Sequence, residues 1–474
     1  MKIKNAIGFA VGPFAVAFFS LLTVPIVAWV FSPEDVGRLN IFQVTISFLL
    51  LFCSLGLDQA FVREYHENEE KNLLFKNCAI PGFFLLLAAF PLGLVFERQI
   101  TFNLYNSEHI GFYLLTFAAA IVSYCSRFLS LILRMQERGL AYSMSQAMPK
   151  AFLLVLLGLL ASLPISKNFL ELLWAYFLSM AFVLLIYIWN TRSQLRVTFE
   201  TKLSGVEVRK LLKFGLPLVV SGVAYWAVNA ASTFMLHGFS DLEQLAIYSV
   251  AVSFAGVAVL VQSIFSVIWT PLAFKWQAEG VDMKRVDVVS QQVLALICIA
   301  LVFCGAFVWI ADYLLPPIYA SVKYLIVCSV IQPLLYTLSI VTSVGIGIAR
   351  KNMLSVLATV TALIANLGTG FLLIPKWGAP GAAIANAFAF YIMFIMNTEA
   401  SARVWRNFPR FRIYVVTGVA VLLSILTCAF ASSLPFSFSI LWALTIPFAI
   451  WLFKSELISI WALFRNKQHG LVRS

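Results

Sequence analysis

The sequence predicts an all-α polytopic membrane protein with about fourteen transmembrane helices, arranged as two pseudo-symmetric six-helix lobes followed by two C-terminal helices. The first observation is composition: of 474 residues, 61% are hydrophobic and 11% charged, whereas about 25% are charged in a typical soluble domain. The second is the length of the apolar runs, which match the ~20 residues that a helix needs to cross ~30 Å of hydrocarbon. The third is an internal repeat. Lipid is therefore the expected solvent of most of this chain.

The predicted spans follow the apolar runs in chain order. They are residues 8–31, 41–62, 78–96, 110–133, 144–164, 170–189, 214–237, 246–270, 289–312, 324–348, 353–374, 381–398, 413–431 and 437–453. The first run follows MKIKN, as in a signal peptide, but it continues past Trp29 and contains Pro13 and Pro25. We therefore interpret it as an uncleaved first span.

The net charge of +12 reports membrane topology rather than nucleic-acid binding, because the basic residues lie mostly in short connections between spans. Alternate connections collect nearly all of the 33 Lys and Arg on one side. The other side holds Arg38, Arg98, Lys167, Lys323 and Lys376. By the positive-inside rule, both termini are expected in the cytoplasm.

An internal repeat divides the chain into two halves. FGLPLVVSG (214–222) is similar to FAVGPFAVA (9–17), and DLEQLAIYSV (241–250) aligns with DVGRLNIFQV (35–44), 206 residues earlier. Because six spans separate the copies, both enter the membrane in the same direction, and the halves are expected to superpose about an axis along the membrane normal with the substrate between them. The predicted domains are a six-helix lobe (1–189), a basic cytoplasmic linker (190–213), a second six-helix lobe (214–398), and two additional helices with a cytoplasmic tail (399–474).

The fourth predicted helix carries a polar face inside the membrane. At 100° per residue, an arc of about 80° contains the following side chains: Thr116, Ser123, Arg127, Ser130, Arg134 and Arg138. A charge at this depth costs about 3 kcal/mol, which favours a wet cavity or a partner around Arg127. Arg127 is expected to be the one basic residue well inside a span.

Three more predicted helices carry polar faces. The tenth helix repeats the pattern of the fourth with Gln332, Tyr336, Ser339, Ser343 and Arg350, the second carries Gln43, Ser47, Ser54 and Asp58, and the seventh carries Ser221, Tyr225, Asn229 and Ser232. These faces either line a cavity or form helix–helix contacts, in which Ser and Thr are common. Asp58 is either an ion-coupling acid or the partner of a neighbouring base. Arg63 is a poor intrahelical partner for it, since a five-residue step rotates the side chain by about 140°.

Sequence motifs along nearly the whole chain resemble those of Wzx-type O-antigen flippases and related polysaccharide exporters, of the multidrug/oligosaccharidyl-lipid/polysaccharide exporter superfamily. They are FSPEDVGRLNIFQ (31–43), SLGLDQAFVREY (54–65), FGLPLVVSG (214–222), IWTPLAFKW (268–276) and IPKWGAPGAAIANAFAFYIMF (374–394). The resemblance implies a MATE-like fold that works by alternating access. It also implies a cargo, an undecaprenyl-diphosphate-linked oligosaccharide moved from the cytoplasmic to the periplasmic leaflet for O-antigen, capsule or exopolysaccharide synthesis. Membrane lipid, a polysaccharide polymerase and chain-length machinery are the further expected partners.

The cargo's diphosphate suits arginine, which stays charged and contacts phosphate oxygens bidentately. The candidate substrate-binding residues are Arg127, Arg134, Lys275 and Arg350 for phosphate, and Ser123, Tyr225, Asn229 and Tyr336 for sugars. Asp58 is the ion-coupling candidate, and the choice among proton, sodium and membrane potential stays open. No cofactor, metal site or catalytic residue is predicted: the four histidines lack metal-ligand spacing and no P-loop is present.

Three alternatives remain open at this point. Lipid II flippases also have fourteen spans, but that family carries arginines in the first helix, whereas residues 8–31 here hold no charge. Drug/cation exporters of the superfamily usually have twelve spans. A membrane-embedded glycosyltransferase or polymerase generally places catalytic groups in a large extramembrane loop, and the outer connections at 97–109 and 313–323 are short. We therefore expect a transporter rather than an enzyme.

Overall fold

The computed structural model describes residues 3–164, 167–200, 203–430, 433 and 438–471. The predicted span ends at 431 and 437, and residues 201–202 of the predicted linker, lie outside the described residues. Every regular element in the described part is a helix, which confirms the predicted all-α class. The chain divides into two compact units, residues 1–230 and 231–474. The boundary falls inside helix α9.

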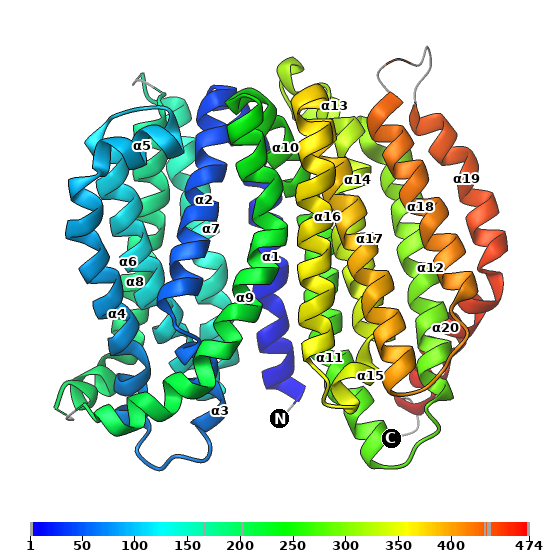
Figure 1. The fold of residues 1–474 in the computed structure, drawn as a ribbon, viewed down its shortest axis with the longest axis horizontal. Helices are drawn as coiled ribbons and strands as arrows, with labels where there is room; N and C mark the ends of the chain where they lie inside the picture. Colours follow the sequence, from blue (N-terminus) through cyan, green and yellow to red (C-terminus); the bar gives the residue numbers. More distant parts are fainter. Residues whose placement is uncertain (1–2, 165–166, 201–202, 431–432, 434–437, 472–474) are drawn as a thin grey trace. The chain divides into compact units, whose positions relative to one another are not determined.

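The first unit contains α1 to α8 and most of α9 (Figure 1). The bounds are α1 Ile3–Val30, α2 Pro33–Cys53, α3 Leu57–Glu64, α4 Lys71–Val95, α5 Glu97–Tyr105, α6 Ile110–Met135, α7 Gly139–Ser162, α8 Phe169–Glu200 and α9 Gly205–Phe239. Helix α6 is the most buried span of this unit and packs against α2, α4, α7 and α8. Helices α8 and α9 continue into the predicted linker, so most of residues 190–213 is helical.

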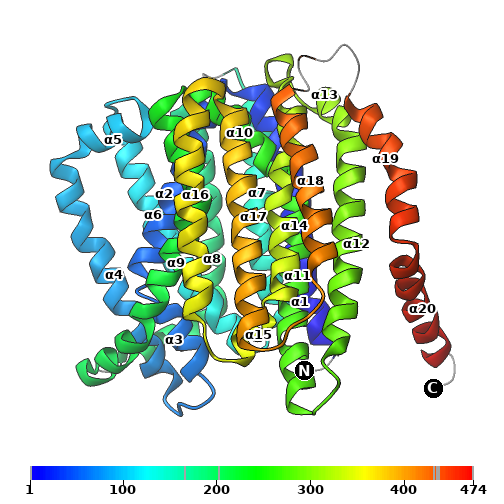
Figure 2. The same ribbon diagram turned by 45° about the vertical axis from the view of Figure 1, so that its right-hand side comes forward.

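The second unit contains the end of α9 and the remaining helices (Figure 2). The bounds are α10 Leu242–Phe254, α11 Gly256–Ala278, α12 Lys284–Phe307, η1 Val308–Ile310, α13 Ala311–Leu314, η2 Pro317–Tyr319, α14 Val322–Thr342, α15 Val344–Ile348, α16 Met353–Trp377, α17 Ala379–Val404, α18 Phe411–Phe430, α19 Phe438–Leu452 and α20 Lys454–Leu471. Helix α14 is the most buried span, packed against α10, α11, α12, α17 and α18. Its place in the second unit matches that of α6 in the first.

Among the described residues, thirteen helices are long and apolar enough to cross a membrane, and a pair bent by 66°, Phe438–Leu452 with Lys454–Ala462, makes fourteen if it counts as one span. The predicted number of spans is confirmed by this length and composition. Several predicted boundaries shift. The second predicted span (41–62) is two helices, α2 and α3, and the eighth (246–270) is divided into α10 and α11.

Candidate functional site

The first unit has an open cavity of about 260 Å³, with polar and apolar lining, among α2, α6, α7 and α8. It is lined by Leu50, Ser123, Ser126, Arg127, Ser130, Ser145, Gln146, Pro149, Met180, Val183 and Tyr187. The predicted residues Ser123 and Arg127 therefore share one cavity. Sequence reasoning missed the contribution of α7 and α8, because Ser145, Gln146 and Tyr187 belong to no polar stripe long enough to stand out in apolar spans.

Arg127 forms an ion pair with Asp58, whose carboxylate Oδ2 lies 2.9 Å from guanidinium Nη2. The Asp58 side chain is 10% exposed and the Arg127 side chain 42% exposed, so the carboxylate is enclosed while the guanidinium keeps an accessible side. The backbone N–H of Gln59 also donates to Asp58 Oδ1 at 2.9 Å. Of the two readings for Asp58, partnership with a base is therefore observed. Arg63 instead lies over the Phe214 ring, 4.4 Å from its centroid.

A break between α2 and α3 positions Asp58. Leu55 and Gly56 have φ of 52° and 68°, in the left-handed region that favours glycine. A Cβ on Gly56 would collide with the backbone carbonyl of Gly215 on α9, and a Cβ on Gly215 would meet the carbonyl oxygen of Leu55. The two glycines therefore let α9 approach the break closely. The new helix then begins at Leu57 and carries Asp58 in its first turn, opposite Arg127.

Lys150 is a second cation inside the membrane-spanning part of the first unit. It lies 11 residues after Gly139, or about 16 Å along α7, close to the middle of a 24-residue helix. No ion pair or hydrogen bond to Lys150 is present among the described residues. The expectation that Arg127 is the one basic residue well inside a span is therefore wrong. The helix begins five residues earlier than the predicted span, which moves Lys150 from near a span end to its centre.

Lys150 lies next to the cavity lining. Its neighbour Pro149 and the residue one turn earlier, Gln146, both line the cavity, and side chains four apart lie on the same side of a helix. Ser143, seven residues before Lys150 on α7, packs against Gly12 of α1. A Cβ on Gly12 would lie 2.7 Å from the Ser143 Cα. Lys150 therefore lies between the cavity side of α7 and the side that packs on α1.

The polar stripe of the fourth predicted helix is only partly a cavity face. Thr116 is buried and hydrogen-bonded to Tyr105 at 2.8 Å, as expected of a packing contact, and Ser123 Oγ contacts the Met180 sulfur at 3.6 Å. The expected continuous line of arginines is wrong: α6 ends at Met135, and beyond this end Arg138 donates to the backbone oxygen of Asn190 at 3.2 Å. The left-handed residue Glu137 (φ 57°) reverses the chain here, while Arg134 stays exposed at the end of α6.

Tyr225 and Asn229 lie on α9, outside the lining of this cavity. The Asn229 amide donates to the Tyr225 backbone oxygen at 2.8 Å. Between them, Trp226 donates its indole N–H to Ser47 Oγ at 3.0 Å and packs on the Phe48 ring at 4.7 Å. Part of the polar face of α9 therefore contacts the polar face of α2.

The second unit holds the other three candidates. Lys275 is exposed on α11 and lies 3.6 Å from Glu279. Arg350 is exposed just after α15, with φ 56°. Helices α11 and α15 pack against each other, so these two basic residues lie at the ends of contacting helices. Tyr336 is half-buried farther along α14 and is not part of this end.

The polar face of α14 is largely a packing face. Asn386 on α17 donates to Gln332 Oε1 at 3.2 Å, and Asn397 donates to Ser339 Oγ at 3.4 Å. Of the two interpretations of this face, helix–helix contact is therefore observed at Gln332 and Ser339. Buried amides joined in this way satisfy polar groups that the lipid cannot.

A model of the family described as polysaccharide biosynthesis protein matches residues 3–277. The chain belongs to this family. The expected relationship to polysaccharide biosynthesis proteins is confirmed. No curated protein matches the sequence significantly.

Solved structures show where this fold occurs. The lipid II flippase MurJ in an inward closed conformation has a TM-score of 0.70 at 12% identity, over 96% of this chain and 100% of that chain. A multidrug resistance MATE family transporter of the MOP superfamily, in an inward-facing conformation, has a TM-score of 0.57 at 14% identity, over 86% and 99%. The outward-facing conformation of such a transporter gives 0.52 at 16%, over 88% and 96%. At these identities the likeness concerns the fold, and it confirms the MATE-like architecture.

Two of the motifs in this family member have structural roles. In FSPEDVGRLNIFQ, Ser32 caps α2 by accepting from the Asp35 N–H at 3.2 Å, and Arg38 donates to the backbone oxygen of Tyr105 at 2.9 Å. In the second unit, Gln244 stands 206 residues after Arg38 and accepts from the Ala379 N–H at 3.1 Å. Corresponding positions on α2 and α10, the second helix of each repeat, thus contact a later helix of the same unit.

Proposed function

We propose that the protein carries a polyprenyl-diphosphate-linked oligosaccharide from the cytoplasmic to the periplasmic leaflet of the bacterial inner membrane by alternating access. The observation that carries the proposal is the pair of cations inside the first unit, Arg127 at the cavity and Lys150, which has no counter-ion in the part of the chain that the structure describes. Each costs about 3 kcal/mol at such a depth. A folded membrane protein retains such charges where they act on an anion or ion, and the family membership makes a lipid-linked saccharide the fitting anion.

The chemistry of the site supports a diphosphate contact at Arg127. Its guanidinium is held on one side by Asp58 and is accessible on the other, so a phosphate can add to it or replace the carboxylate. Such a replacement frees Asp58, which makes this residue our candidate for coupling to a proton or sodium ion. Arg134, Lys275 and Arg350 are further candidate phosphate ligands, and Ser123, Tyr225, Asn229 and Tyr336 are candidate sugar ligands.

A deletion strain tests the cargo. We expect lipid-linked oligosaccharide to accumulate on the cytoplasmic face, and surface polysaccharide to disappear, with both effects reversed by the wild-type chain. Accessibility to a membrane-impermeant lectin or periodate in spheroplasts reports the leaflet. Normal surface polysaccharide and normal lectin labelling in the deletion strain would exclude this cargo. The polymerase and the chain-length machinery, which would act on the exported oligosaccharide, are the proposed downstream partners.

The second candidate cargo is lipid II, favoured by the likeness to the lipid II flippase MurJ over 96% of this chain. Both cargoes present a polyprenyl diphosphate, so the same cations serve either. Complementation separates them: a lipid II exporter would sustain growth of cells depleted of their own lipid II flippase, and an oligosaccharide exporter would not.

A further inference from the structure

We propose that a second pocket of the first unit, at the turn between α3 and α4, binds uncharged sugar rings of the cargo's oligosaccharide. The proposal rests on the proposed function for the identity of the saccharide. The pocket is separate from the cavity at Arg127. Ile132 lines it from α6, five residues after Arg127, and five residues at 100° each turn the two side chains about 140° apart on this helix.

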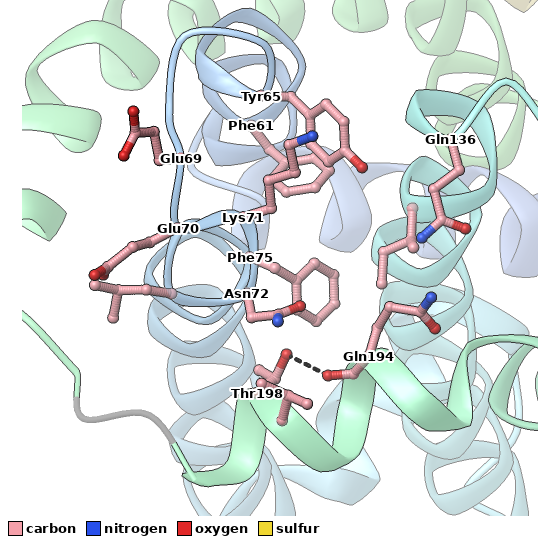
Figure 3. Close-up of a pocket in the computed structure, with 13 residues that line it drawn as sticks. Phe61, Tyr65, Glu69, Glu70, Lys71, Asn72, Phe75, Gln136, Gln194 and Thr198 are labelled. Atoms are coloured by element: carbon pink, nitrogen blue, oxygen red, sulfur yellow. Dashed lines mark hydrogen bonds between the residues drawn. The ribbon is translucent and has the colours of Figure 1, made fainter.

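The pocket has the size and the elements of a ligand site (Figure 3). Its volume is about 430 Å³, within the ~300–1,000 Å³ of small-molecule sites. The lining residues are Phe61, Tyr65, Glu69, Glu70, Lys71, Asn72, Leu73, Phe75, Ile132, Gln136, Gln194, Val197 and Thr198. Figure 3 shows Tyr65 and Thr198 at opposite ends of the pocket, with Asn72 and Phe75 between them. Four segments of the chain therefore converge on one hollow.

The hydrogen-bonding groups match hydroxyls. A sugar hydroxyl donates and accepts, so it is best met by carboxamides, which do both, and by carboxylates, which accept. Asn72 and Gln136 supply carboxamides, and their side chains form no hydrogen bond with other residues in the described part of the chain. Glu69 and Glu70 supply exposed carboxylates. Gln194 supplies a further carboxamide. The neighbouring Thr198 hydroxyl donates to the backbone oxygen of Gln194 at 2.8 Å.

An aromatic cluster forms the apolar part of the pocket. The Phe61 ring lies edge-on to Tyr65 at 5.4 Å and to Phe75 at 5.7 Å. The ammonium of Lys71 lies over the Tyr65 ring, 5.0 Å from its centroid, which holds this ring in place. Burial raises the pKa of the Tyr65 phenol, so it stays protonated. Such a rigid surface suits the C–H face of a sugar ring, which is the apolar part of an otherwise hydroxylated molecule.

The charge of the pocket distinguishes a sugar from a phosphate or an anionic lipid head group. Its lining carries two carboxylates, Glu69 and Glu70, against one ammonium, Lys71. This is an acidic excess in a chain whose net charge is +12. A phosphate would meet like charge here, whereas neutral and amino sugars would not. The diphosphate is therefore expected at Arg127 and the saccharide alone in this pocket.

Saccharide binding to the purified full-length protein tests the proposal. The probe is the delipidated repeat unit, released by mild acid from the lipid-linked pool of the source strain, with saturation-transfer NMR and calorimetric titration as the readouts. We expect binding to the wild type, and a loss of about tenfold or more in affinity in Glu70→Gln/Gln136→Ala, since a charge-assisted and a neutral hydrogen bond are removed. Asn72→Ala alone should weaken binding in the same direction.

A matched control exists in Glu67→Gln/Gln277→Ala, two exposed residues outside the pocket, which should bind as the wild type does. Thermal unfolding of each variant verifies folding. Absence of wild-type binding, or unchanged affinity in the pocket variants, overturns the proposal. So does binding of glycerol 1-phosphate in place of the saccharide, which would assign the pocket to an anionic lipid head group. None of these results tests the cargo assigned under the proposed function. Failure of that function is measured separately, as normal surface polysaccharide in the deletion strain.

Discussion

The ion pair between Asp58 and Arg127 yields the sharpest prediction, through the variants Asp58→Asn, Arg127→Gln and the double variant. At 2.9 Å, the Coulomb attraction is at most about 6 kcal/mol for an effective dielectric constant of ~20. Because the Arg127 side chain is 42% exposed, solvent reduces the net worth of the pair to about 1–2 kcal/mol. Asp58→Asn also leaves the arginine uncompensated in the membrane, at a cost of about 3 kcal/mol.

We therefore expect each single variant to lower the free energy of unfolding by about 3–5 kcal/mol. The double variant should lose less than the sum of the two, by a coupling energy of about 1–2 kcal/mol, since neither charge is left alone. Thermal unfolding of the purified proteins in detergent and their steady-state amount in the membrane measure these effects. Strictly additive losses would show that the ion pair contributes nothing.

Export separates the binding role of Arg127 from its packing role. In a strain lacking the native copy, Arg127→Gln and the double variant should export no polysaccharide even where their abundance is normal, because the cation that lines the cavity, and that is proposed to meet the diphosphate, is removed. Arg127→Lys should retain part of the activity, since lysine keeps the charge but loses bidentate geometry. Asp58→Asn should still bind cargo and transport it slowly, because only the coupling carboxylate is removed. Full export by Arg127→Gln would refute the substrate contact.

Three other predictions follow from particular residues. Lys150→Gln should raise the thermal stability, because it removes an unpaired charge that costs about 3 kcal/mol within a membrane span. The same variant should lower the amount of surface polysaccharide, which Lys150→Arg should preserve. Unchanged export in the glutamine variant would exclude a cargo role. Gly56→Ala should cost about 2–4 kcal/mol in unfolding free energy, through backbone strain at φ 68° and collision with the Gly215 backbone, whereas Gly158→Ala, with open space around it, should be close to neutral in the same melts. A reporter fused at His469 should remain cytoplasmic, and its export to the periplasm would contradict the predicted topology.

The candidate site shows which inferences need the fold. Arg127 stood out in the sequence because a charge among apolar residues is conspicuous, but its partner did not. Asp58 lies 69 residues away, and the left-handed turn at Leu55 and Gly56 aims it at α6. Lys150 was overlooked since a five-residue error at a helix start is enough to turn a mid-membrane lysine into an interfacial one. Boundary errors of this size are normal in sequence reasoning.

Stripes of hydroxyl and amide residues were the weakest guide. The sequence could not separate Ser123, which lines the cavity, from Ser339, which contacts Asn397 of α17. A polar side chain within a membrane span needs a partner in either case, whether water in a cavity or another helix. The periodicity of a sequence shows which face of a helix is polar. The contacts of that face depend on the neighbouring helix, which the sequence pattern does not identify. The same limit applies to the pocket of Figure 3, whose lining comes from four separate segments.

The sequence by itself determined the all-helical membrane class, the number of spans and the family, whereas the superposition of the two halves stays a prediction. These properties depend on residues that are close together in the sequence. About twenty consecutive side chains decide whether a segment enters the bilayer, and nearby Lys and Arg residues orient it. Only the tertiary structure decided that Arg127 meets Asp58, that Lys150 forms no ion pair or hydrogen bond among the described residues, and that Asn72 and Gln136 converge on one pocket. Such contacts depend on how helices rotate and approach each other, which side-chain packing over long sequence separations determines.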